Sequence, residues 1–304
     1  MNEIVITDTD FCRFRDYFYQ KTGIFFENSK RYFVDKRLLQ RIELTEHQSF
    51  RGYFTYLRFQ ASGEELQAVI NALTVNFTYL RFQASGEELQ AVINALTVNE
   101  TYFFREISQL ESLVEEVLDD IVRHRPGELI RIWSMPCSSG EEPYSIVLFL
   151  LEHWPKLEQV DIEIIASDID TGILQKAAQG IFSARSVKNL PNSSLNKYFS
   201  LRADGSYQLI DDIRQSVRFT QTNLNNRAEV QKLGAMDVIF CRNLLIYFDD
   251  ISRRNAVESF YEQLNPGGVL FLGHSESMSR ISSIFHVKRF RKSTGYYKPH
   301  KGKK

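Results

Sequence analysis

The sequence is poor in cysteine, and this shortage excludes two kinds of site. It holds three cysteines among 304 residues, Cys12, Cys137 and Cys241, and none of them stands in C-x-x-C or Cys/His ligand spacing. An odd number of widely separated cysteines predicts neither a disulfide framework nor a zinc site. We therefore expect no metal and a location in the reducing cytoplasm.

Long apolar runs and a surplus of positive charge are also missing. No stretch approaches the roughly 18 apolar residues of a membrane-spanning helix, and the N-terminal sequence lacks the pattern of a secretory signal, so we expect neither membrane insertion nor export. Lys and Arg number 37 against 38 Asp and Glu. Because phosphate binding needs a surplus of Lys and Arg, a nucleic-acid-binding protein is disfavoured. What is present is ordinary globular composition, 43% apolar and 25% charged, long enough for an α/β domain and a smaller companion.

A tandem repeat is the first internal feature. Residues 54–76 recur letter for letter as residues 77–99. Solenoid repeats diverge and come in three or more units, so a single perfect copy indicates a recent duplication or an assembly artefact. Each copy predicts one amphipathic helix, because apolar residues at helical spacing follow a Ser-Gly-Glu-Glu start. Since the second copy joins Glu100 directly, we expect the first copy to bulge out or to take the place of its twin.

Two kinds of hydrophobic pattern divide the chain. Residues 1–99 predict a helical domain, with a first helix marked by Phe11, Phe14 and Phe18 and a second over about 29–44. Residues 100–304 predict a mainly parallel α/β sheet, because short apolar runs alternate with helical segments. Turn signals over about 183–214 break this alternation and predict a small antiparallel β-hairpin insertion. The expected strands are 129–134, 162–167, 217–220, 237–241, 269–273 and 294–298.

Acidic residues follow two of the expected parallel strands, at the edge where such sheets bind ligands. Glu142 stands in the first turn of a helix after the first strand, where it can receive a cationic amino group. Paired with Glu141 it would repel a pyrophosphate, which disfavours a dinucleotide and suits the methionine end of S-adenosylmethionine. Asp168, after the second strand, can accept hydrogen bonds from both ribose hydroxyls. Both acids also have plainer explanations, since Glu142 complements a helix dipole and Asp168 can cap the next helix.

The fourth strand ends in Cys241-Arg242-Asn243, and Tyr247 follows. Amino-group methyltransferases commonly carry an Asn/Asp-Pro-Pro-Tyr clamp at this place. Both prolines are missing here, so an adenine or cytosine N-methyltransferase is disfavoured. Asn243 as a capping amide and Tyr247 as a packing residue remain alternative interpretations.

Six motifs, taken in order, resemble the CheR family of chemotaxis receptor methyltransferases. They are Asn99-Glu-Thr-Tyr-Phe-Phe-Arg105, Ser138-Ser-Gly-Glu-Glu-Pro-Tyr-Ser145, Ala166-Ser-Asp-Ile-Asp170, Thr222-Asn-Leu224, Phe240-Cys-Arg-Asn-Leu-Leu-Ile-Tyr-Phe248 and Gly273-His-Ser-Glu276. The resemblance covers essentially the whole chain apart from one copy of the repeat. It implies a Rossmann-like S-adenosylmethionine-dependent methyltransferase that esterifies glutamate side chains of chemoreceptor cytoplasmic domains and releases S-adenosylhomocysteine.

The resemblance also implies roles for matching residues. Arg105 and Tyr247 match the family's residues beside the transferring methyl group. The family commonly has alanines or glycine before the Ser-Thr-Gly-Glu-Glu turn, whereas this chain has Met135, Pro136 and Cys137. The expected cofactor contacts are Asn99, Thr101, Arg105, Glu142, Asp168, Asn223, Leu224, Arg242 and Asn243.

The expected partner is an acidic helix face of a receptor. A glutamate carboxylate is already ionised at neutral pH, so its attack on a sulfonium methyl needs no general base. A basic segment of the helical domain matches such a partner, although a solvated charged face is the plainer explanation. That segment contains Lys30, Arg31, Lys36, Arg37 and Arg41.

The hairpin insertion bears on how the receptor is held. Family members that tether to a receptor's C-terminal pentapeptide carry a three-residue, glycine-containing lengthening there. That lengthening is absent, so we expect a tether-independent enzyme, acting as a monomer. Two alternatives stay open: a methyltransferase for a small-molecule acid or amine, and a non-catalytic S-adenosylmethionine-binding signalling module.

Overall fold

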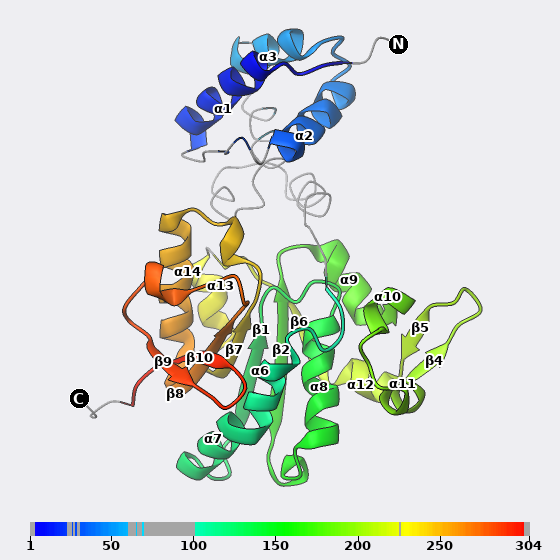
Figure 1. Cartoon of the computed structure of the whole chain (residues 1–304), viewed down its shortest axis with the longest axis vertical. Helices are drawn as coiled ribbons and strands as arrows, with labels where there is room; N and C mark the ends of the chain where they lie inside the picture. The colour runs from blue at the N-terminus through cyan, green and yellow to red at the C-terminus, as the bar shows by residue number, and fades with distance from the viewer. Residues whose placement is uncertain are drawn as a thin grey trace. The chain divides into compact units, whose positions relative to one another are not determined.

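The computed structural model describes residues 4–22, 26, 28, 31–59, 65, 69, 101–224 and 226–300. The chain divides into two compact units, Met1–Thr97 and Val98–Lys304. Figure 1 labels the elements of both units, the first helical and the second built around a sheet. No helix in these described ranges is long and apolar enough to cross a membrane.

The first unit contains the helices α1 (Asp8–Thr22), α2 (Arg31–Leu44) and α3 (Phe50–Phe59). Apolar residues recur every three or four positions, so each helix turns one apolar stripe inward. Aromatic rings from α1 and α3 meet in the core, with Phe14 and Phe54 in edge-to-face contact at 6.1 Å between ring centroids. The buried stripes are Phe11, Phe14 and Phe18 of α1, Val34, Leu38 and Ile42 of α2, and Phe50, Tyr53, Phe54 and Leu57 of α3.

The first copy of the repeat belongs to this core. Its residues 54–59 complete α3, and Val69 is fully buried with the helical stripes. Glu65 is buried as well, because the Tyr53 hydroxyl donates to its carboxylate at 2.5 Å and the Arg41 guanidinium donates at 2.8 Å. The expectation that the first copy bulges out is therefore wrong for its described residues. The second copy lies outside the described residues.

The second unit is built on a seven-stranded sheet in the order β6-β2-β1-β7-β8-β10-β9. The first five strands in this order run parallel, and β10 pairs antiparallel with both β8 and β9, which confirms the predicted α/β class. The chain builds outward from β1 through β2 to β6 and then returns to place β7 on the other side of β1. The bounds are β1 (Ile130–Ser134), β2 (Ile162–Asp168), β6 (Val217–Gln221), β7 (Met236–Cys241), β8 (Leu264–Leu272), β9 (His286–Arg289) and β10 (Thr294–Tyr297).

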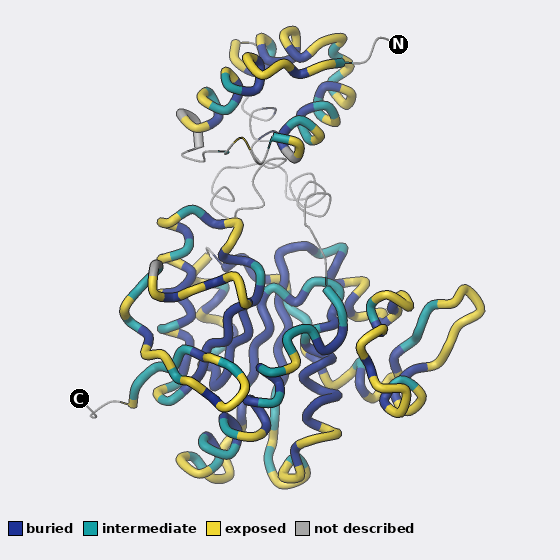
Figure 2. The backbone as a smooth tube through the Cα atoms, in the orientation of Figure 1, coloured by how far each residue is buried: buried dark blue, intermediate teal, exposed yellow. Residues whose placement is uncertain are grey.

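Helices cover this sheet and leave its central strands buried, as the dark tube in Figure 2 shows. Every residue of β7 is buried, as expected for a parallel strand with both faces covered. Side-chain caps fix the starts of several helices: for example, Asp170 accepts from the Ile173 amide at 2.9 Å, and Asp249 accepts from the Ser252 amide at 2.7 Å. The helical bounds are α6 (Ile107–Ser112), η3 (Leu113–Val117), α7 (Leu118–His124), α8 (Glu141–His153), η4 (Leu157–Gln159), α9 (Thr171–Gln179), α13 (Arg227–Lys232), η5 (Leu245–Tyr247), α14 (Asp250–Gln263) and η6 (Met278–Arg280).

The predicted insertion is a small antiparallel sheet in the order β3-β5-β4. The expected hairpin is present as β4 and β5, and β3 extends it with two residues that precede the expected range. The Phe103 ring packs edge-on against Phe182 and Phe199, so the insertion is anchored to the segment that leads into α6. The bounds are β3 (Ile181–Phe182), α10 (Ala184–Val187), α11 (Asn192–Tyr198), β4 (Phe199–Leu201), β5 (Tyr207–Leu209) and α12 (Asp211–Gln215).

Candidate active site

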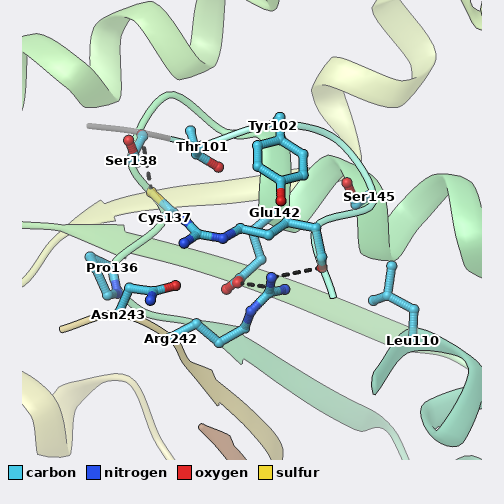
Figure 3. A pocket seen from close by; sticks show the side chains of 11 residues that line it. Thr101, Tyr102, Leu110, Pro136, Cys137, Ser138, Glu142, Ser145, Arg242 and Asn243 are labelled. Atoms are coloured by element: carbon cyan, nitrogen blue, oxygen red, sulfur yellow. Dashed lines mark hydrogen bonds and ion pairs between the residues drawn. The ribbon is translucent and has the colours of Figure 1, made fainter. Parts of the chain in front are cut away.

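A pocket lies where the strand order reverses, between the carboxyl ends of β1 and β7 (Figure 3). It holds about 610 Å³ of non-protein space, including its opening to solvent. Three segments build its wall: the residues before α6, the loop from β1 into α8, and the residues after β7. Crevices at this position are the usual ligand sites of doubly wound sheets. The lining residues are Thr101, Tyr102, Arg105, Leu110, Pro136, Cys137, Ser138, Glu142, Ser145, Arg242 and Asn243.

The structure brings part of the predicted cofactor set together in this wall. Thr101, Arg105, Glu142, Arg242 and Asn243 all line the pocket, although they come from three separate segments. The lining does not include the remaining described members, Asp168, Asn223 and Leu224, nor Tyr247. Asn99 lies outside the described residues.

Arg242 is the centre of the charged network in the pocket wall. Its guanidinium lies 3.1 Å from a Glu142 carboxylate oxygen and 3.5 Å from Glu106, and it donates to the Arg105 carbonyl at 2.7 Å. The Arg242 side chain is only 4% exposed, so these charges interact in a poorly solvated environment. Arg242 thereby holds the backbone at Arg105 and offsets part of the negative charge of Glu142 and Glu106.

Glu142 is held by two partners. The Ser134 hydroxyl donates to one carboxylate oxygen at 2.7 Å, while Arg242 pairs with the other. Burial raises the pKa of Glu142, and the Arg242 charge opposes that rise. Each oxygen retains a lone pair, so the oriented carboxylate can also accept from a ligand ammonium group.

Asp168 lies at the end of β2, directly behind the pocket loop. Its carboxylate accepts the amide of Ser138, a lining residue, at 2.9 Å and the amide of Asp170 at 3.0 Å. Burial raises the pKa of Asp168 to about 6. The plainer explanation of Asp168 as a helix cap is wrong, because the side chain of Asp170 caps α9.

Asn223 and Leu224 follow β6, the neighbour of β2. The Thr222 amide donates to the Asp168 carbonyl at 3.1 Å, so both residues begin at the same sheet edge as Asp168. Leu224 is fully buried and Asn223 nearly so. Together they continue the carboxyl-end edge of the sheet beyond the residues that line the pocket.

Glu276 organises the loop that carries Asn243 and Tyr247. Its buried carboxylate accepts the amides of Gly273 and Asn243 at 2.9 Å each and that of Ile246 at 3.3 Å. Burial raises the pKa of Glu276. The sequence placed Glu276 in a motif without assigning it a role, and the acid three residues after Gly273 was the available signal. Tyr247 ends η5 and is 36% exposed.

Glu276→Gln is expected to lower kcat about tenfold and to destabilise the protein. An amide offers one acceptor oxygen and turns an NH₂ group toward backbone donors, and a buried donor left unsatisfied costs about 1–3 kcal/mol. Steady-state kinetics and urea unfolding would measure the two effects. The matched control is Glu258→Gln, an exposed position on α14. Equal behaviour of the two variants would contradict the positioning role of Glu276.

Backbone conformations that are unfavourable for side-chain-bearing residues gather in the pocket segments. Phe104, Glu106, Ser138 and Asn243 have φ values of 56°, 53°, 50° and 57°. Each such conformation costs about 1–3 kcal/mol and persists only where the surrounding contacts hold it in place, which is often at functional sites. Within the described part of the chain, one other non-glycine residue, Glu46, has a positive φ.

The buried oxygen Asn243 Oδ1 provides a test of whether a cofactor fits. Among the described residues it has no hydrogen-bond partner, and Asn243 lines the pocket. A buried acceptor without a donor is costly, so this wall suits a ligand that supplies an N–H or O–H group. S-adenosylmethionine carries an ammonium group, ribose hydroxyls and an adenine amino group, so it can supply the donor that Asn243 Oδ1 lacks and further donors to Glu142 and Asp168.

The predicted basic face is partly used within the helical unit. Arg31 lies 3.1 Å from Asp35 and also contacts Asp8, while Arg41 pairs with Glu65. Arg37 is half-buried and donates to Gln40 at 3.1 Å, and Lys36 is exposed. Lys30 lies outside the described residues.

The sheet order and the carboxylates around the pocket define the second unit as a Rossmann-like α/β domain for a nucleoside-containing cofactor. Comparison with protein families narrows this class. The family model for the CheR methyltransferase SAM binding domain matches residues 99–294, and that for the CheR all-alpha domain matches residues 9–74. The chain belongs to the CheR methyltransferase family and is an S-adenosylmethionine-dependent methyltransferase, which confirms the predicted class, cofactor and family.

Three curated relatives show how similar the chain is to characterised members. Chemotaxis protein methyltransferase 2 of Vibrio cholerae serotype O1 is 92% identical over 303 residues, which span 100% of this chain and 97% of that protein. Chemotaxis protein methyltransferase 2 of Pseudomonas aeruginosa is 36% identical over 93% of this chain and 91% of its own length. The Escherichia coli chemotaxis protein methyltransferase is 34% identical over 94% and 90%.

The family matches also bear on the tandem repeat. Residues 75–98 lie between the two matched ranges and belong to neither. This stretch is nearly all of the second copy, residues 77–99. The first copy, whose described residues pack in the helical core, is the one that the all-alpha family model covers.

Proposed function

We propose that this enzyme transfers the methyl group of S-adenosylmethionine to glutamate side chains of chemoreceptor cytoplasmic domains. One observation carries the proposal: Arg105 lines the pocket, and no histidine is among the lining residues in the described part of the chain. Amine or hydroxyl acceptors need a base to remove a proton, whereas a carboxylate acceptor needs a cation to orient it. The names of the curated relatives agree with a role in chemotaxis.

The reaction balances without proton transfer. A carboxylate oxygen of the acceptor forms a bond to the methyl carbon, the carbon–sulfur bond breaks, and the electron pair stays on sulfur. The cofactor supplies an activated methyl group. The protein's residues have to align the acceptor with that group and exclude water, and alignment of this kind can be worth roughly 7–11 kcal/mol.

The positions of the residues support the following proposed roles. Glu142 receives the cofactor's ammonium group, Asp168 receives the ribose hydroxyls, and Asn243 accepts a donor through Oδ1. Arg105 orients the acceptor oxygen. Tyr247, four residues beyond Asn243 on the Glu276-anchored loop, positions the acceptor. Arg242 holds both Glu142 and the backbone of Arg105. Thr101, Asn223 and Leu224 complete the cofactor contacts, and for Asn99 we keep the predicted contact.

The same proposal covers the partner. Lys36 is exposed on α2 and, with Arg37, belongs to the basic segment that would face an acidic receptor helix. The connection between β4 and β5 is short, residues 202–206, which supports independence from a pentapeptide tether. A titration that detects tight pentapeptide binding would oppose that part. We place the enzyme in the cytoplasm, where the receptor domains and free cysteines belong, and propose that it acts as a monomer.

The decisive experiment is incubation with radiolabelled S-adenosylmethionine and a panel of purified receptor cytoplasmic domains. We expect label on at least one receptor and its release as methanol in mild base, because carboxyl methyl esters are base-labile. Label that resists base would indicate another acceptor class. Cofactor binding by calorimetry without any methylation would favour the alternative of a non-catalytic signalling module.

A further inference from the structure

Two cationic side chains lie over one aromatic ring at the edge of the pocket. Tyr102 lines the pocket together with Glu142 (Figure 3). The Arg105 guanidinium carbon lies 5.7 Å from the centroid of the Tyr102 ring, and the Lys188 ammonium nitrogen lies 5.3 Å from it. Cations within about 6 Å of an aromatic centroid are attracted by the ring quadrupole. The ring therefore holds two positive charges beside the pocket.

The position of Lys188 is set by buried contacts, although it comes from a distant part of the chain. It directly follows α10 in the insertion. The Phe103 amide donates to the Ser186 carbonyl at 2.9 Å, and the Phe103 ring packs on Phe182 at 4.8 Å between centroids. The insertion thus carries Lys188 to the same segment that carries Tyr102 and Arg105.

The charge of Lys188 is not neutralised within the described residues. Lys188 is exposed and forms no salt bridge there. Lys197 in the same insertion provides a contrast, because its ammonium group pairs with Glu152 at 2.9 Å and lies 4.8 Å from the Tyr198 ring. Two like charges over one ring repel each other, and an incoming anion would relieve that repulsion.

We infer that Lys188 and Arg105, both seated on Tyr102, form a cationic rim that receives the carboxylate of the methyl acceptor. Lys188 attracts the acceptor on its approach, and Arg105 orients it at the reacting position. This inference rests on the proposed function, since it assumes an anionic side chain as the acceptor. It makes Lys188 a specificity-determining residue that favours acidic over neutral acceptor surfaces.

The test compares Lys188→Gln with Lys197→Gln, a lysine on a tyrosine ring away from the pocket. Both full-length variants are assayed with a receptor cytoplasmic domain that the wild-type enzyme methylates. For Lys188→Gln we expect a KM for the receptor that is about fivefold higher at low salt, with a smaller difference at high salt. The change falls on KM rather than kcat, and Lys188→Glu raises KM further. Lys197→Gln keeps the wild-type KM.

Cofactor affinity, measured by calorimetry, separates the outcomes. Wild-type affinity in Lys188→Gln shows that the variant is folded and that the effect lies in acceptor binding. An unchanged receptor KM at low salt overturns the inference and leaves the proposed function standing. Weakened cofactor binding also overturns it, because Lys188 would then belong to the cofactor site. Failure of the wild-type enzyme to methylate any receptor instead overturns the proposed function.

Discussion

Arg105→Ala is expected to lower kcat for receptor methylation by about 100-fold while cofactor affinity changes little. The guanidinium orients an anion in a poorly solvated pocket, and loss of one such preorganised donor typically costs 10²–10³ in rate, about 3–4 kcal/mol. The backbone should survive the substitution, because Arg242 holds the Arg105 carbonyl rather than the side chain. Single-turnover methylation measures the rate, and calorimetry measures the affinity.

Two variants sharpen this prediction. Arg105→Lys keeps the charge but loses the planar set of donors, so it should recover only part of the rate. Arg123→Ala, at a side chain that is 71% exposed on α7, is the matched control and should behave as wild type. An Arg105→Ala enzyme with wild-type kcat would remove Arg105 from the reaction. Tyr247→Phe should also reduce kcat more than affinity, by a smaller factor, because the ring remains.

Much of the α/β fold could be predicted because its signals are local. β1, β2, β6, β7 and β10 fall within two residues of their expected positions, since each is a short apolar run between turn signals. The parallel arrangement alone predicts that the residues after the strands, Glu142 and Asp168 among them, lie at the same edge of the sheet. β9 and the helical segment 107–124 were not predicted, because an exposed edge strand and a helix with a π-helical turn have weak periodicity.

The parts of the site that escaped prediction depend on contacts between distant residues. The bond from Arg242 to the Arg105 carbonyl and the amides gathered by Glu276 have no sequence pattern, because only folding brings these groups together. The positive φ values of Glu106 and Asn243 are similarly imposed by their surroundings. Charge pattern likewise identified Arg41 as basic without revealing that Glu65 neutralises it.

Asp168→Asn is expected to weaken cofactor binding and to remove the fall in stability between pH 4 and pH 8. Burial raises the pKa of Asp168 from 3.8 to about 6 in the folded protein. The folded state therefore holds the proton more tightly, so this group favours folding below pH 4 and loses that contribution as the pH rises through 6. At pH 8 the buried charge costs up to about 3 kcal/mol. Asparagine cannot ionise, so the variant avoids this cost at pH 8. Its NH₂ group, however, faces the amide of Ser138 or of Asp170 and leaves that donor unsatisfied, which costs about 1–3 kcal/mol. The variant should therefore be less stable than the wild type at pH 4 and close to it at pH 8.

Cofactor affinity should fall about 100-fold in the same variant, because hydrogen bonds to a charged acceptor are worth about 1.5–3 kcal/mol and the amide offers one acceptor oxygen. Wild-type affinity should also weaken as the pH falls below 6, whereas the variant's affinity should not follow that titration. Urea unfolding and calorimetry between pH 5 and 8 test both effects, with the exposed Asp161→Asn as control. A variant that binds S-adenosylmethionine as tightly as the wild type would show that the ribose is held elsewhere. A variant less stable than the wild type at pH 8 would show that losing one acceptor oxygen for the amides of Ser138 and Asp170 costs more than burying the charge of Asp168.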